Sequence, residues 1–246
     1  VGTHPEIVSL GEITYLPRSF VRGATCTCGT PVPQCGFWRD VMRELGQRSG
    51  ADYQADPYAL DLGMMLASHH VDKRKQTAAY VLGWKLVHGA AILPWLGAFS
   101  RRLDKAVENN FALFEAARRR AGARLAVDSS KSYVKGLALY RARPGNVRLI
   151  LSSRDGRGVL YSRLKRGVPR EPALKIWRNY YERALPLIEK VVAPEHVLRV
   201  RYEDLTHSPG KELERICAFL GLAFHPCMLD FSSKTHHMPE GNDMRL

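Results

Sequence analysis

The second half of the chain alternates short apolar runs rich in β-branched residues with longer stretches whose apolar residues recur at helical spacing. This alternation is typical of an α/β fold with a parallel sheet. It predicts strands at residues 125–128, 147–152 and 197–202. It predicts helices at residues 103–121, 133–143, 157–166 and 171–192, and a further helix that has Ser208 as N-cap, starts at Pro209 and stops at Gly221.

The first hundred residues are less regular. A loop rich in Pro, Gly and Cys is predicted from Thr25 to Gly36, and an amphipathic helix follows from Phe37 to about Gln47. The most apolar stretch, residues 81–99, contains Lys, His and Pro, so no membrane span is expected. We therefore expect one domain over residues 1–246, with an insertion rich in loops and helices.

Composition adds a preference for anionic partners. The chain has 37 Lys and Arg against 24 Asp and Glu, a net charge of +13. Nucleic acid, acidic membranes and phosphorylated small molecules all suit such a charge. The five Cys residues form no disulfide-framework spacing and no signal peptide opens the chain, which predicts a cytoplasmic protein.

One segment, residues 149–162, carries specific chemistry. A strand ends in Arg154, the chain turns through glycines, and a helix carrying Ser162 follows. Ligands of α/β folds bind at the carboxyl ends of strands, and a guanidinium fork matches phosphate oxygens. The plainer interpretation is a surface Arg beside a helix start that is capped by Asp155.

This Arg-Asp-x6-Ser pattern resembles the 3′-phosphate-binding motif of sulfotransferases that use 3′-phosphoadenosine-5′-phosphosulfate (PAPS), where the Arg and the Ser hold that phosphate. Residues 127–131, Val-Asp-Ser-Ser-Lys, resemble the segment of this family whose Lys approaches the bridging oxygen of the phosphosulfate. The resemblance implies that Lys131 stabilises the leaving phosphate. Without the neighbouring motifs, a solvated Lys in a polar turn is the simpler interpretation.

Two later segments match the family in the same order. Residues 201–205, Arg-Tyr-Glu-Asp-Leu, resemble its Tyr-Glu-Asp-Leu segment, which implies that Tyr202 contacts the adenine. Residues 236–245 resemble the C-terminal cofactor loop of bacterial members, which implies that Gly241, Asn242 and Arg245 close over the nucleotide. Residues 4–12 resemble the segment after the 5′-phosphosulfate loop and its helix in bacterial and tyrosylprotein-type members; that loop is missing here, and we expect it upstream of Val1.

The general base has two candidates. Glu12 matches by position the Gly-Glu segment that supplies the base in tyrosylprotein-type relatives, and it is the preferred one. His88 is the alternative, although its surroundings are apolar, which is typical of a core histidine.

The cysteines at 26, 28 and 35 share one loop. Their spacing suits zinc if a fourth ligand exists, but the sequence shows no partner nearby, and the adjacent His236 and His237 lack further ligands. Packing in a tight turn is the favoured interpretation, and no metal is expected.

The resemblance implies an α/β domain with a central parallel sheet of the P-loop type, flanked by helices, and a helix- and loop-rich acceptor insertion. The expected reaction moves a sulfuryl group from PAPS to a hydroxyl or amine and leaves 3′,5′-ADP. The acceptor class (small molecule, carbohydrate, lipid or peptide) and the oligomeric state stay open, and no nucleic acid is expected. Alternatives are another P-loop enzyme, such as a small-molecule kinase, or a basic nucleic-acid-binding protein, which the Arg118–Arg120 run suggests.

Overall fold

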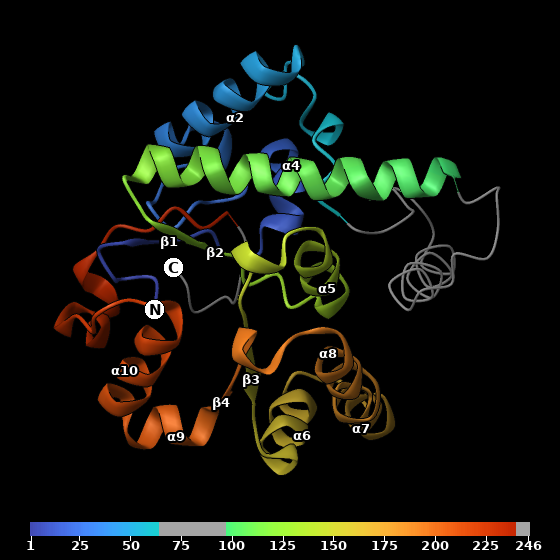
Figure 1. The fold of residues 1–246 in the computed structure, drawn as a ribbon, viewed down its shortest axis with the longest axis vertical. Coiled ribbons are helices and arrows are strands. Elements are labelled where there is room, and N and C mark those ends of the chain that lie inside the picture. Colours follow the sequence, from blue (N-terminus) through green and yellow to red (C-terminus); the bar gives the residue numbers. More distant parts are fainter. Residues whose placement is uncertain (64–96, 240–246) are drawn as a thin grey trace. The chain divides into compact units, whose positions relative to one another are not determined.

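Two compact units make up the chain in the computed structural model, which describes residues 1–63 and 97–239. The first unit comprises Val1–Ala138 with His225–Leu246, and the second comprises Leu139–Phe224. Each unit holds one parallel pair of strands, β1 with β2 and β3 with β4 (Figure 1). Helices intervene in sequence between paired strands, so the α/β class with parallel strands is confirmed. The single-domain organisation stays a prediction.

The first unit is mostly helical around its short strand pair. Its strands are β1 (Ile7–Ser9) and β2 (Leu125–Val127), and its helices are α1 (Leu16–Arg22), α2 (Gly36–Ser49) and α4 (Gly97–Ala121). Strand β1 was not predicted, because three residues are too few to show a period. The α2 helix confirms the predicted helix from Phe37 to about Gln47, beginning one residue earlier and ending two residues later.

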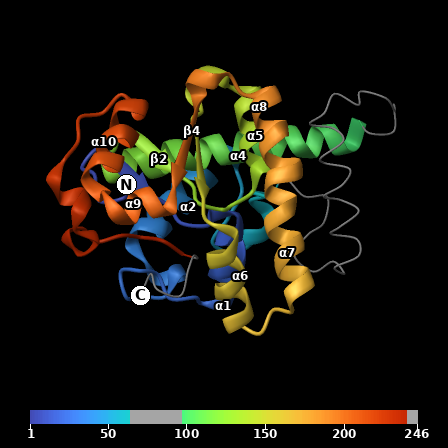
Figure 2. The same ribbon diagram turned by 90° about the horizontal axis from the view of Figure 1, so that it is seen from below.

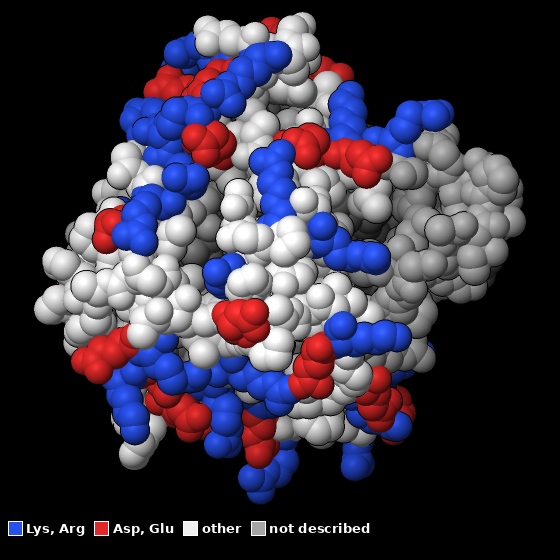
Figure 3. Space-filling view, viewed as in Figure 1, with Lys and Arg blue, Asp and Glu red and all other residues white. Residues whose placement is uncertain are grey.

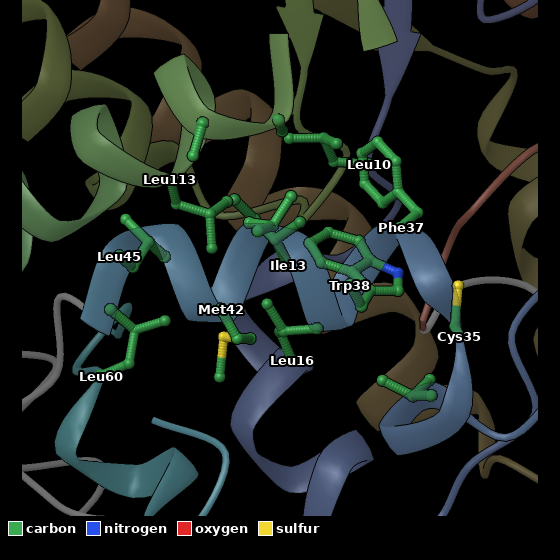
Figure 4. Packing of buried hydrophobic residues seen from close by; sticks show 14 of the residues in the cluster. Leu10, Ile13, Leu16, Cys35, Phe37, Trp38, Met42, Leu45, Leu60 and Leu113 are labelled. Atoms are coloured by element: carbon green, nitrogen blue, oxygen red, sulfur yellow. The ribbon is translucent and has the colours of Figure 1, made fainter. Parts of the chain in front are cut away.

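The core of this unit is formed where α2 packs against α4 and the segment after β1 (Figure 4). Trp38, Met42 and Leu45 lie at helical spacing on one face of α2, and all three are buried. Leu113 of α4 faces them, and Ile13 fills the space beside Trp38. The carboxyl ends of β1 and β2 are therefore anchored to a well-packed interior.

The end of the described chain also belongs to the first unit. The Lys234 Nζ atom donates to the carbonyl oxygens of His4 (3.1 Å) and Ile7 (2.9 Å), and the Cys227 Sγ atom donates to that of Thr3 (3.3 Å). These bonds join residues 225–239 to the start of the chain.

The second unit carries the predicted alternation. Helix α5 (Tyr133–Ala142) leads into it, its strands are β3 (Leu149–Ser153) and β4 (Val197–Arg201), and its further helices are α6 (Gly156–Lys165), α7 (Arg170–Asn179), α8 (Leu185–Val191), α9 (Tyr202–His207) and α10 (Pro209–Leu220). Helices α6 and α7 pack side by side (Figure 2). The Ser153 and Arg201 residues are register partners, so the two strands end at the same level.

Two local predictions need correction. The helix expected at residues 171–192 is interrupted by a π-helical turn, Tyr180–Ala184, between α7 and α8. Ser208 occupies the N-cap position of α10 as predicted, but its side chain makes no capping hydrogen bond. Gly221 ends that helix with φ 67°, in the left-handed conformation that glycine adopts at little cost.

Candidate functional site

Arg154 and Tyr202 meet at the carboxyl edge of the β3–β4 pair. Each is the first residue after its strand, and the strands are parallel and in register at their last residues. The Arg154 guanidinium carbon lies 4.5 Å from the centre of the Tyr202 ring, a cation–π contact. Tyr202 is 43% exposed, so the pair faces solvent at the edge where α/β folds bind ligands.

A hollow of about 840 Å³ opens at this edge. Its lining comes from the β3–α6 turn, the first turn of α6 and α9: Arg154, Asp155, Arg157, Gly158, Tyr202, Glu203, Asp204, Thr206 and His207. Such a volume is of the size that holds a drug-sized ligand. The sequence-predicted Arg154 and Tyr202 are thus brought together in one hollow.

The acidic groups of the hollow already have partners. The backbone N–H of Asp155 donates to Glu203 Oε1 at 2.9 Å, and this bond lowers the pKa of the Glu203 carboxyl. The Arg157 side chain and backbone N–H bond to Asp155 and lower the pKa of its carboxyl. Asp155 thereby caps α6, which is what the plainer interpretation of this segment expects.

The Arg154 guanidinium forms no ion pair with any carboxylate in the described ranges, and the Tyr202 ring is its partner. The hollow therefore offers one guanidinium whose charge is not neutralised by a neighbouring carboxylate. An anion is the ligand that this arrangement favours.

Two residues fix the turn that carries Arg154. The Trp177 Nε1–H donates to the Arg154 carbonyl oxygen at 3.4 Å, and a Cβ on Gly156 would lie 2.9 Å from the Trp177 ring. Any larger residue at position 156 would displace this ring. Ser162 lies half-buried on α6 and is not among the residues lining the hollow, so its assignment to the same phosphate stays a prediction.

A second group of predicted residues meets in the first unit, at the carboxyl edge of β1 and β2. The Lys131 Nζ atom lies 2.5 Å from Glu12 Oε1, joining the loop after β2 to the loop after β1. The Glu12 side chain is 15% exposed and that of Lys131 is 71% exposed. The backbone of Lys131 has φ 57°, and within the described ranges Lys131 is the one non-glycine residue with a positive φ. Such a conformation costs about 1–2 kcal/mol.

A buried ion pair stabilises the loop after β2 that carries Lys131. The Lys135 Nζ atom lies 2.8 Å from Asp128 Oδ2 and also donates to the Thr14 hydroxyl at 3.2 Å. Burial lowers the pKa of Lys135, and the Asp128 carboxylate opposes that shift. Asp128 Oδ1 in turn accepts from the backbone N–H of Ser130 at 2.9 Å. Sequence reasoning missed Lys135, whose only signal was a lysine in an otherwise apolar helical stretch.

Four predicted residues fall outside the described part of the chain: the alternative base and the residues of the C-terminal cofactor loop, namely His88, Gly241, Asn242 and Arg245. Their roles stay predictions.

The cysteine loop has a partner that the sequence did not reveal. The Cys35 Sγ atom lies 3.4 Å from His237 Nδ1, across 202 positions of sequence. Because no local spacing links the two, only the tertiary structure brings them together.

Basic residues are dispersed among acidic ones on the face drawn in Figure 3. The Arg118–Arg120 run follows this pattern. Arg118 and Arg119 contact Glu115 at 3.1 and 2.6 Å, and Arg120 contacts Asp40 at 2.8 Å. Among residues 1–63 and 97–239, no helix combines the length and the apolar composition that a membrane span requires.

Known proteins share features with this chain. The model of a family described as the sulfotransferase family matches residues 70–226, more than half of the sequence. A search of curated proteins gives no match. Among solved structures, the chain is similar to the sulfotransferase domain from the curacin biosynthetic pathway, with 18% identity over 96% of this chain and 80% of that one and a TM-score of 0.42. It is also similar to the sulfotransferase domain from the Synechococcus PCC 7002 olefin synthase, with 21% identity over 98% of this chain and 78% of that one and a TM-score of 0.42.

Proposed function

Since the chain belongs to the sulfotransferase family, we propose that it transfers a sulfuryl group from PAPS to a hydroxyl or amine. The bond between sulfur and the bridging phosphate oxygen breaks, and a new bond forms from sulfur to the acceptor atom. The products are 3′,5′-ADP and the sulfated acceptor, and the proton of the acceptor passes to a base. No redox step or resident cofactor enters this balance.

The observation that carries the proposal is the Arg154–Tyr202 pair in its hollow. An unneutralised guanidinium at a strand end suits a phosphate monoester, and an exposed aromatic ring suits a nucleobase. The 3′-phosphate of PAPS supplies the first group and its adenine the second. The N-terminal end of α6, Gly156–Lys165, adds the partial positive charge of the helix dipole beside Arg154. We assign the 3′-phosphate to Arg154 with Ser162, and the adenine to Tyr202.

Glu12 and Lys131 are assigned to the transfer step. A carboxylate accepts the proton of the attacking hydroxyl or amine, and an ammonium group stabilises the negative charge that develops on the leaving phosphate. Their direct contact and the left-handed backbone of Lys131 support this assignment, because strained residues concentrate at functional sites. Asp128 and Lys135 act as positioning residues for the same loop.

The donor assignment is tested by Arg154→Ala. Loss of the charge-assisted bond is expected to weaken binding of 3′,5′-ADP by about 1.5–3 kcal/mol, measured by calorimetric titration. Binding of 5′-ADP, which lacks the 3′-phosphate, should change little, so the preference for 3′,5′-ADP should narrow.

The matched control is Arg178→Ala. Arg178 is also an exposed arginine of the second unit, but it lies on α7, pairs with Glu182 and does not line the hollow. It should leave both dissociation constants unchanged. An unchanged affinity of Arg154→Ala for 3′,5′-ADP would contradict the assignment. Equal affinity of the unsubstituted protein for 5′-ADP and 3′,5′-ADP would favour a kinase-type enzyme instead.

A further inference from the structure

Four metal-ligating side chains converge in the first unit, apart from the residues assigned to sulfuryl transfer. The Cys₃His cluster consists of Cys26, Cys28, Cys35 and His237, and its ligand atoms all lie within 4.8 Å of one another. Three of the four come from one loop, and the fourth comes from the end of the described chain. Three sulfurs and one imidazole nitrogen form a donor set that selects zinc.

The distances suit a tetrahedral ion. The Cys28 and Cys35 sulfurs are 3.7 Å apart, and the Cys35 sulfur is 3.4 Å from His237 Nδ1. Bonds of ~2.3 Å to sulfur and ~2.0 Å to nitrogen place tetrahedral ligand atoms ~3.8 Å and ~3.5 Å apart. A disulfide requires ~2.05 Å between sulfurs, so the two cysteines stand at ligand spacing and not at bonding distance.

Hydrogen bonds from two backbone N–H groups hold the two segments of the cluster together. The Thr27 N–H donates to the Met238 carbonyl oxygen at 3.3 Å, and the Met238 N–H donates to the Thr27 hydroxyl at 2.9 Å. These reciprocal bonds join the middle of the Cys-x-Cys run to the residue after His237. Gly29, with φ 87°, closes the tight turn after Cys28. The ligands are therefore preorganised by their own backbone.

Side-chain contacts orient the donor atoms as well. The His237 ring stacks on Phe37, with centroids 4.9 Å apart and an angle of 3° between the planes, so Nδ1 is held toward Cys35. The Thr30 hydroxyl lies 3.1 Å from the Cys28 sulfur, where it can donate to a thiolate. Cys26 and Cys35 are buried. Outer-shell contacts of this kind fix ligand orientation in metal sites.

We propose that the Cys₃His cluster binds one structural Zn²⁺ ion. The ion replaces the thiol protons, satisfies all four donors and clamps the cysteine loop to the segment that ends in His237 and Met238. All four positions are then taken by protein ligands, which is the closed coordination of a structural site. The ion takes no part in sulfuryl transfer.

The test begins with the full-length protein purified without chelators. Elemental analysis is expected to find about one zinc per chain, the stoichiometry of a single closed site. Replacement of zinc by Co²⁺ should produce the intense visible bands of tetrahedral cobalt with thiolate ligands. Removal of the metal by a strong chelator should lower the melting temperature by several degrees, and added zinc should restore it.

Two variants and one control assign the ligands. Cys35→Ser and His237→Gln are each expected to reduce the retained zinc at least tenfold, on the scale by which metal sites respond to altered ligation. Cys227→Ser is the matched control, because Cys227 lies outside the cluster and its hydroxyl replacement can still donate to the Thr3 carbonyl oxygen. It should retain zinc fully.

Each other outcome overturns the proposal. Absence of zinc, together with the absence of cobalt–thiolate bands in fully reduced protein, would leave only close packing. A Cys28–Cys35 disulfide found by mass spectrometry would replace the metal by a covalent link. Full retention of zinc by His237→Gln would show that His237 is not the fourth ligand. If the variants fail to fold, X-ray absorption of the unsubstituted protein decides between three sulfur and one nitrogen ligands and any other set.

Discussion

Replacing Glu12 by glutamine is expected to slow sulfuryl transfer by about 10²–10⁴-fold, the contribution of a well-placed general base. The amide has nearly the same shape and its carbonyl oxygen can still accept from Lys131, but it cannot take a proton from the acceptor. The measurement is the single-turnover release of 3′,5′-ADP from PAPS with an acceptor found by screening phenols, alcohols and amines. Binding of 3′,5′-ADP should be unchanged.

Glu6→Gln is the control for this substitution. Glu6 directly precedes β1, and its carboxylate pairs with Arg124 at 3.2 Å on the surface, so its loss should leave the transfer rate intact. A Glu12→Gln protein that transfers at the unsubstituted rate would exclude Glu12 as the base and would leave His88 as the remaining candidate. An equal loss in both variants would indicate damage to β1 and not to the chemistry.

Replacing Asp128 by alanine is expected to lower the free energy of unfolding by about 3–5 kcal/mol, because it leaves the Lys135 ammonium group buried without a counter-charge. The Lys135 side chain is 3% exposed and that of Asp128 is 14% exposed. Urea denaturation measures the loss. Without Asp128 the pKa of Lys135 in the folded state falls further below the pKa of an unfolded lysine. Between these two pKa values the unfolded state binds more protons than the folded state, so the stability of the variant rises with pH. The deficit should then shrink as the pH rises toward about 10.4, the pKa of an unfolded lysine.

The double variant Asp128→Ala/Lys135→Met separates charge burial from packing. An apolar pair avoids the uncompensated charge, so the double variant should be more stable than Asp128→Ala alone. If the loss of stability in the double variant equals the sum of the losses in Asp128→Ala and in Lys135→Met alone, the two side chains do not interact. That result would contradict the buried ion pair.

Much of the second unit was predictable because its signals are local. The β3 strand is a run of apolar residues, Arg154 follows it directly, and α10 is marked by Pro209 at its start and Gly221 at its end. A parallel pair puts the residues that follow its strands at one edge, which is why the motif that contains Arg154 and the one that contains Tyr202 pointed to a common place.

The remaining features depend on contacts between distant segments. The three-residue β1 becomes a strand only by pairing with β2, and Lys131 meets Glu12 only because those two strands are parallel neighbours. The cysteine loop gave three ligands, and nothing local indicated that His237 packs beside them. A lysine in an apolar stretch does not reveal its counter-ion, so the Lys135–Asp128 pair was also out of reach.

The pairing of distant segments in the first unit has a consequence for synthesis on the ribosome. Residues 139–224 form a unit that is contiguous in sequence, so all of its segments have emerged before residues 225–239 are made. At that stage the first unit is incomplete, because Lys234 has not yet been made and cannot donate to the carbonyl oxygens of His4 and Ile7. Until the last segment arrives, β1 keeps an incomplete covering. Nascent chains stalled before residue 225 should therefore be the form that chaperones recognise.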